Sequence, residues 1–302
     1  MTAWLDVETW QVDGLLFGST VDGAEYVVRE VTGWSSSAAP RTARIPRPAA
    51  HGSYRSPNWK GDRVITLAGY VAVDDKVMAL AVERRLERLC GDPEILYPLR
   101  HIDSTSGEDL TLWVELDAAI LVNTRYDLSP LQVDFSLQVA ASDQRKYTST
   151  ASTASTGLAT PAEGGVAWDG TAGGTGTEWN GPAGTTGLEY QTTGGTLGTV
   201  DLVNAGTEST PVKFTITGNV TNPLVRNLTT GEVIAYGGTL TATDVLVIDT
   251  GTGAVTLNGA NRRPQLTRAD FFQIPQGTTR IQFEGTAVSG TPQLFAEWYS
   301  AY

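Results

Sequence analysis

A chain of 302 residues, of which 40% are hydrophobic, is long enough for two globular domains and too apolar for an intrinsically disordered protein. Its 33 glycines and 14 prolines favour short strands joined by turns and exclude an all-α fold. The net charge of −12 argues against a dedicated nucleic-acid-binding protein. No apolar run approaches the ~18 residues of a membrane helix, and no signal peptide is evident, so we expect cytoplasmic synthesis and no membrane anchor.

Four segments of the first half are predicted to be strands. Residues 110–116 and 131–139 alternate apolar and polar side chains, which is the period of a half-buried antiparallel strand. Residues 63–73 are apolar at odd and even positions alike, which predicts a central strand covered on each face. Residues 24–31 are a further candidate. Together these patterns predict a mainly β first domain that resembles a β-sandwich.

One segment of the first half has helical periodicity. Either Asp74 or Asp75 can cap its N-terminus, and Gly91 can end it. Its apolar positions recur about every 3.6 residues, at Met78, Val82, Leu86 and Leu89. We therefore expect a single helix of about four turns, packed on the sheet.

The composition changes after Tyr147. Small polar residues dominate the next stretch and predict a flexible linker over residues 149–161. Alternating apolar segments return from Val200, separated by turn signals, at the spacing of a β-sandwich. We predict a first domain over residues 1–148 and a second over 162–302, whose glycine- and threonine-rich beginning leaves the exact boundary open.

Few residues are candidates for catalysis. His51 and His101 are the only histidines, and we interpret His101 as a surface residue beside a loop. With one cysteine, Cys90, neither a typical zinc site nor an internal disulfide can be assembled. Asp244 and Asp249 flank a predicted strand and are candidates for calcium, but acidic residues are common in turns for structural reasons. We therefore expect no enzyme, no bound metal and no cofactor.

A short basic segment stands out in this acidic chain. Prolines interrupt it, and the basic and aromatic residues that it offers for a subunit interface are Arg41, Arg44, Arg47, Arg55, Trp59, Lys60 and Arg63. Nucleic-acid binding needs a folded basic face, which the net charge opposes. Docking on the acidic surface of a neighbouring identical subunit explains the same asymmetry, since rings are built from such contacts. We favour this hypothesis and keep a solvated hairpin as the alternative.

Several motifs, taken in order, resemble one known family. In the first half they are RIPRPAAHGSYRSPNWKGDRVITLAGYV, the helix after it and LQVDFSLQVAASDQRKY. In the second half they are NAGTESTPVKFTITGNVTNPLVRNLTTGE, VLVIDTGTGAVTLNG and FAEWYSAY. Their order and spacing resemble the distal tail proteins, a class of minor tail protein, of long-tailed, non-contractile bacteriophages, especially phages of actinobacteria.

This resemblance implies a structural virion protein at the tail tip or baseplate. Its first domain is expected to assemble as a hexameric ring, and its second to be a galectin-like β-sandwich. The ring is expected to join the tail tube protein to tail-tip hub, fibre or receptor-binding proteins. Genomic DNA is expected to pass through the lumen without specific binding, because an acidic wall repels phosphates over about a Debye length of ~8–10 Å.

A galectin-like domain also suggests an alternative function, that of a carbohydrate-binding adhesion module for host-surface glycans. Sugar sites often stack an exposed aromatic ring on the sugar, and the candidates are Trp168, Trp179 and Tyr299. Trp298 alternates with Leu294, so we expect it in the core instead.

Overall fold

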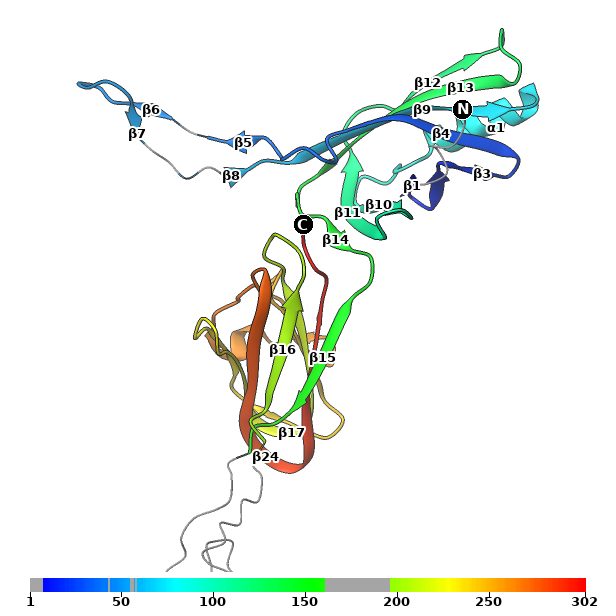
Figure 1. Ribbon diagram of the computed structural model, residues 1–302. Helices are drawn as coiled ribbons and strands as arrows, with labels where there is room; N and C mark the ends of the chain where they lie inside the picture. The colour runs from blue at the N-terminus through cyan, green and yellow to red at the C-terminus, as the bar shows by residue number, and fades with distance from the viewer. Residues whose placement is uncertain (1–7, 43, 55–56, 58, 161–195) are drawn as a thin grey trace, which may run out of the picture. The chain divides into compact units, whose positions relative to one another are not determined.

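The computed structural model describes residues 8–42, 44–54, 57, 59–160 and 196–302. The chain divides into two compact units, Met1–Ser149 and Thr150–Tyr302, and strands dominate both (Figure 1). The described residues contain one α-helix and one short 3-10 helix, so the predicted mainly β fold class is confirmed. Neither of these helices has the length and apolar character needed to cross a bilayer.

In the part of the chain that the structure describes, the first unit is built on one ten-stranded antiparallel sheet. Its strands are β1 (Glu8–Val12), β2 (Leu15–Phe17), β3 (Ser19–Val21), β4 (Ala24–Thr32), β9 (Arg63–Val73), β10 (Tyr97–Asp103), β11 (Glu108–Leu116), β12 (Leu121–Arg125), β13 (Leu131–Ala141) and β14 (Tyr147–Thr148). Neighbours follow the order β2, β1, β10, β11, β13, β9, β4 and β3, with β12 on β13 and β14 on β11. Gly18, which links β2 to β3, donates its N–H to the carbonyl of Tyr26 on β4, next to the β3–β4 pairing of Ser19 with Tyr26.

All four strands predicted in the first half are present, as β4, β9, β11 and β13. β9 lies between β13 and β4, so it has a strand on either side. Ile65, Leu67 and Val71 are fully buried on one face of β9. The other face is only half-buried, so the prediction that β9 is covered on both faces is wrong. On that face Tyr70 is covered by the guanidinium of Arg29, 4.3 Å from its ring centroid, instead of by a second apolar layer.

The helix α1 (Lys76–Glu87) begins where the sequence predicts. The carboxylate of Asp75 accepts the N–H of Met78 at 2.8 Å, which satisfies one of the free donors of the first turn. The helix packs toward β9, β12 and β13. Its buried residues are Ala79, Val82 and Leu86.

The end of α1 differs from the prediction. The helix has twelve residues and stops at Glu87, so it is shorter than four turns. Cys90, and not Gly91, takes the left-handed conformation, with a φ of 51°. The N–H of Cys90 donates to the carboxylate of Asp13 at 3.1 Å, and this contact holds a conformation that side chains other than glycine rarely adopt.

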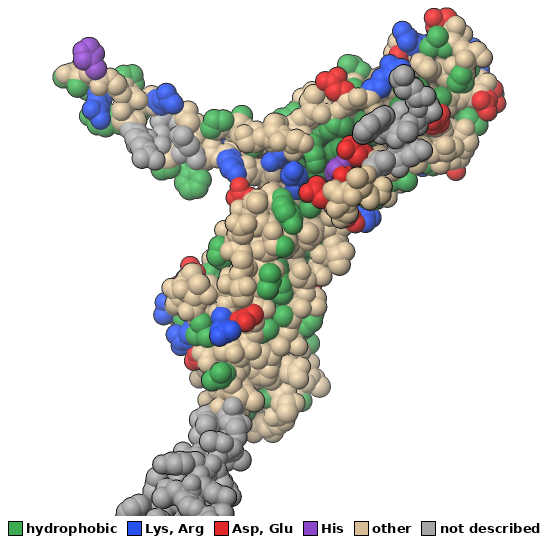
Figure 2. Space-filling view, viewed as in Figure 1, with side chains coloured by type: hydrophobic (Ala, Val, Ile, Leu, Met, Phe, Trp, Pro, Cys, Tyr) green, Lys and Arg blue, Asp and Glu red, His purple; other side chains and the backbone are tan. Residues whose placement is uncertain are grey.

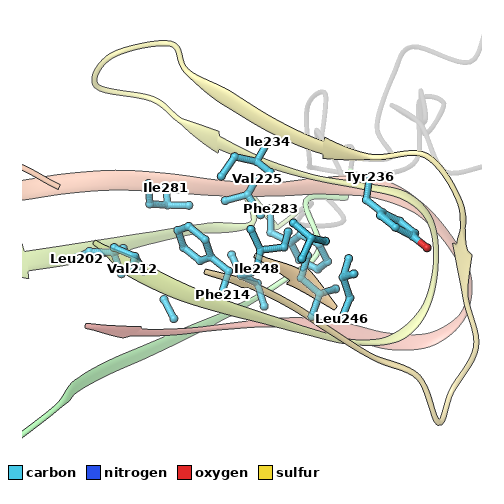
Figure 3. Packing of buried hydrophobic residues seen from close by; sticks show 14 of the residues in the cluster. Leu202, Val212, Phe214, Val225, Ile234, Tyr236, Leu246, Ile248, Ile281 and Phe283 are labelled. Atoms are coloured by element: carbon cyan, nitrogen blue, oxygen red, sulfur yellow. The ribbon is translucent and has the colours of Figure 1, made fainter. Parts of the chain in front are cut away.

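The second unit folds a ten-stranded sheet, again counted over its described residues, around one apolar core. Its elements are β15 (Ser152–Gly157), β16 (Thr199–Asn204), β17 (Val212–Asn227), β18 (Val233–Tyr236), β19 (Thr239–Leu240), β20 (Val245–Asp249), β21 (Val255–Leu257), β22 (Ala260–Asn261), η1 (Arg263–Gln265), β23 (Leu266–Ala269) and β24 (Gly277–Trp298). β17 and β24 pair along most of their length, with register shifts in the middle that bend the sheet. The sheet thereby encloses Phe214, Ile248 and Phe283 (Figure 3).

The structure differs from the predicted linker over residues 149–161. Within it, β15 pairs antiparallel with the C-terminal half of β24. Its serine, threonine and alanine side chains bury little apolar surface, so the backbone ladder with β24 holds the strand in place. A pattern search for apolar alternation cannot detect such a strand. In the sequence, the boundary between the two compact units falls between Ser149 and Thr150.

Candidate interaction surfaces

The basic segment forms a two-stranded arm that continues the β4–β9 ladder of the first unit (Figure 1). β5 (Pro40–Arg41) pairs with β8 (Trp59–Lys60), and β6 (Ile45–Pro46) pairs with β7 (Ser53–Tyr54). In these ladders Arg41 lies opposite Trp59, and Ile45 lies opposite Tyr54. Residues directly opposite each other share a face of the hairpin, so aromatic side chains sit beside a basic and an apolar one.

The arm exposes side chains that usually seek burial. The exposed fraction is 67% for Trp59, 66% for Ile45 and 57% for Tyr54. Arg41, Arg44, Arg47 and Lys60 are exposed as well, whereas Arg55 lies outside the described residues. Hydrophobic and basic side chains therefore gather together along this hairpin (Figure 2). This mixed surface is typical of a contact region, since isolated hairpins have no core of their own.

Arg63 differs from the other basic residues of the segment, because it is only 9% exposed. Its Nη1 donates to the carbonyl oxygens of Gly33 at 3.1 Å and Trp34 at 2.8 Å, and also to that of Ser36. Its Nε donates to the carbonyl of Gln144 at 3.0 Å. Burial lowers the pKa of the Arg63 guanidinium. The structure thus places Arg63 at the base of the arm, where it fixes the chain that leads out of β4.

A groove of about 610 Å³ lies beside β4 within the first unit. Residues 25–31 of β4 line it, together with Trp10 of β1 and with Trp34, which follows β4. The rings of Trp10 and Trp34 meet edge to face, with centroids 5.0 Å apart, and both are buried. The groove therefore combines a strand edge with a rigid aromatic floor.

His101 is buried in this aromatic cluster, so its interpretation as a surface residue is wrong. It lies on β10 two residues after Leu99, and both side chains point to the covered face of the strand. The His101 ring centroid is 4.2 Å from that of Trp10 and 5.4 Å from that of Trp34. Its Nε2 lies 3.9 Å from a carboxylate oxygen of Glu8, and its Nδ1 has no hydrogen-bond partner among the described residues.

Acidic side chains outnumber basic ones around the groove. The acidic residues are Glu8, Glu25, Glu30, Asp103 and Glu108, and the basic ones are Arg29 and Lys146. The Lys146 ammonium lies 5.0 Å from the Trp34 ring centroid, and Arg29 covers Tyr70. Burial lowers the pKa of His101 and outweighs the nearby carboxylates, which raise it. Burial likewise lowers the pKa of Lys146. The groove is thus an acidic surface around a histidine that is neutral at pH 7.

The structure describes one of the three aromatic candidates for glycan stacking. Tyr299 is 39% exposed, and Trp168 and Trp179 lie outside the described residues. Trp298 is buried, as expected, and its indole N–H donates to the carbonyl of Val203 at 2.9 Å.

The two aspartates considered for calcium organise turns. Asp244 accepts the backbone N–H of Thr241 at 2.8 Å and the side-chain amide of Asn258 at 2.7 Å. Asp249 accepts the N–H of Gly251 at 2.8 Å. Over the described part of the chain, no group of three or more histidine, cysteine, aspartate or glutamate side chains is arranged to hold a metal ion.

Residues 205–299, which include most of the strands of the second unit, match the family model of the siphovirus-type tail component, C-terminal domain. This matched segment, called here the tail component domain after the model that it matches, makes up about a third of the chain. It begins before β17 and ends just after β24, so it contains the long strand pair that encloses the core. No curated protein matches the sequence of the chain.

Solved structures extend the likeness beyond the tail component domain. The Dit protein (gp 19.1) of phage SPP1 aligns over 98% of this chain and 99% of its own length, with a TM-score of 0.62 and 13% identity. A chain of the phage P2 baseplate, in its activated conformation with Ca, aligns over 96% of this chain and 98% of its own length, with a TM-score of 0.50 and 11% identity. The two phage proteins therefore share their fold with this chain.

Proposed function

We propose that this protein is a distal tail protein of a long-tailed, non-contractile phage and forms a hexameric ring at the tail tip. One observation carries this proposal: the tail component domain at residues 205–299 lies in a chain whose fold matches SPP1 Dit over nearly its full length. SPP1 Dit is described as a paradigm of the hub of the adsorption apparatus in phages that infect Gram-positive bacteria. The same role makes this chain a structural virion component that acts by docking and not by catalysis.

The arm supplies a physical reason for self-assembly. A two-stranded hairpin is marginally stable in water by itself, and apolar side chains such as Trp59 and Ile45 gain free energy when a partner covers them. If each copy gives its arm to the next copy, the contact is head to tail. Repetition of one such contact closes a ring when the rotation between neighbouring copies divides a full turn evenly and involves no shift along the axis.

The proposed ring joins the tail tube protein on one side to tail-tip hub, fibre or receptor-binding proteins on the other. The charge of −12 per copy is multiplied around the ring, and acidic side chains facing the lumen repel DNA phosphates at short range. The genome then passes without specific binding. Motif order and the use of arginine in preference to lysine support an actinobacterial host, since the sequence holds four lysines in all.

Native mass spectrometry of the purified chain tests the ring. One copy has a mass of 32.1 kDa, so we expect a species of about 193 kDa whose fraction rises with protein concentration. A closed assembly with a different number of copies contradicts the hexamer. Immunogold labelling of virions with an antibody against the chain tests the location independently, and we expect gold at the tail tip. Gold on the capsid contradicts the proposed role even if a ring forms in solution.

A further inference from the structure

We propose that the groove beside β4 receives the arm of a second copy of this chain. This inference rests on the proposed ring and deepens it, because it names the surface that accepts the arm. The groove lies entirely within the first unit and has a volume of about 610 Å³. Two properties of its lining select the occupant: an open strand edge and an excess of acidic groups.

The strand edge favours an extended occupant. β3 pairs with β4 only from Ala24 to Tyr26, yet β4 continues to Thr32 and pairs with β9 on its other side. Among the residues that the structure describes, no strand covers the rest of this edge, and residues 25–31 line the groove. An open edge of this kind binds an extended segment through backbone hydrogen bonds, as an added strand.

Charge favours a basic occupant. Five acidic residues surround the groove, and its two basic residues both lie over aromatic rings. A basic segment complements this lining, because its cations pair with the carboxylates.

The arm has the matching properties. Arg41, Arg44 and Arg47 are exposed on it and supply the cations. Its exposed apolar residues, Ile45 and Trp59, supply surface that gains from contact with the groove. The arm and the groove belong to the same chain, so every copy carries one arm and one groove that can receive an arm. This is the arrangement that a ring of identical subunits requires.

The arm of the same chain is held away from this edge of β4. Gly33 follows β4 directly, with a φ of 87°, and a Cβ at this position would come within 1.9 Å of the carbonyl oxygen of Val64 on β9. Arg63 of β9 also holds the carbonyls of Gly33 and Trp34. The chain that leaves β4 is therefore tied to β9, on the edge opposite to β3. The groove edge is left for another copy.

Charge reversal in the full chain tests the pairing. The arm variant carries Arg41→Glu, Arg44→Glu and Arg47→Glu, and the groove variant carries Glu25→Arg and Glu30→Arg. A matched control outside the groove carries Glu87→Arg and Glu94→Arg. All of these side chains are exposed. The oligomeric state of each is measured by light scattering after gel filtration. Circular dichroism verifies that each variant is folded.

We expect the arm variant and the groove variant each to remain monomeric, because like charges then meet at every contact. An equimolar mixture of the two should assemble again, since acidic arms then meet basic grooves and basic arms meet acidic grooves. The control should assemble like the wild type. The inference is overturned if the groove variant assembles as well as the control, or if the mixture remains monomeric while the control forms rings.

A peptide titration separates failure of this inference from failure of the proposed ring. A fluorescein-labelled peptide of residues 38–62 is titrated into the arm variant, whose groove is unaltered. We expect saturable binding that weakens at least about tenfold when Glu25→Arg and Glu30→Arg are added. Absent binding, or binding that these exchanges do not change, overturns the inference even when the wild type forms rings. Binding by a chain that never forms rings supports the groove and contradicts the hexamer.

Discussion

The β4–β9 ladder and the arm are two halves of one long hairpin, and they differ in what covers them. Leu67 and Ile65 in the ladder have no exposed surface, whereas Ile45 and Trp59 in the arm are about two-thirds exposed. Both halves have paired backbones, so backbone hydrogen bonding alone does not distinguish them. The burial of apolar side chains distinguishes the ladder from the arm. The ladder is stabilised by the core of its own unit, and the arm depends on surface supplied by a partner.

The largest effect is expected in the covered half. Leu67→Ala removes buried methyl groups from β9 and should lower the free energy of unfolding of the first unit by about 2–5 kcal/mol. Hydrogen exchange of β9 and β13, followed by mass spectrometry at concentrations too low for assembly, measures this change. Ile45→Ala is the matched exchange in the arm and should change the same quantity by less than about 0.5 kcal/mol. Equal losses would remove the distinction between the two halves.

The junction between the halves should respond next. Arg63→Met keeps the length of the side chain but removes the donors to the carbonyls of Gly33 and Trp34. Leaving buried acceptors unpaired should cost about 2–3 kcal/mol of stability. It should also speed amide exchange at Gly61, whose N–H donates to the carbonyl of Ala39 at the base of the arm. Arg44→Met is the control, and an unchanged exchange rate at Gly61 in Arg63→Met contradicts the anchoring role.

A smaller effect should depend on pH. Burial lowers the pKa of His101 in the folded chain, so the unfolded chain, with a pKa near 6.5, takes up this proton first as the pH falls. The stability contributed by neutral His101 is complete above about pH 6.5 and decreases below it. The groups that face the ring are Glu8, Asp103, Glu108 and Lys146. Urea unfolding from pH 7.5 to 5 should therefore lose less stability in His101→Phe than in the wild type. Parallel curves would contradict this assignment.

The sequence predicts those parts of the fold in which side chains carry the signal. β11 and β13 are found by apolar alternation, and α1 by the cap at Asp75 and its apolar stripe. β15 escapes detection, because its pairing with β24 is made by the backbone of small residues. The true end of α1 also escapes, since a side-chain contact from Asp13 lets Cys90 take the place expected of glycine.

The candidate surfaces were predictable only where they are continuous in sequence. The arm is found from its run of arginines, although Arg63 belongs to its buried base. The groove is not found, because Trp10, Trp34 and His101 are brought together by the order of the strands. The pairing of Leu99 and His101 on one face of β10 is a local signal for the burial of the histidine, but it gives no indication of its neighbours.

The smallest change in stability is expected at the most exposed aromatic residue of the arm. Trp59→Ala removes a large side chain that is 67% exposed, so the first unit should keep its free energy of unfolding to within about 0.5 kcal/mol. Assembly should nevertheless require a higher protein concentration, because tryptophan is frequently an anchor of protein interfaces. Unfolding at low concentration and light scattering over a concentration series measure the two quantities separately. A loss of stability in the monomer would show that Trp59 already packs within its own chain, and the contrast between the two halves of the hairpin would then fail at its outer end.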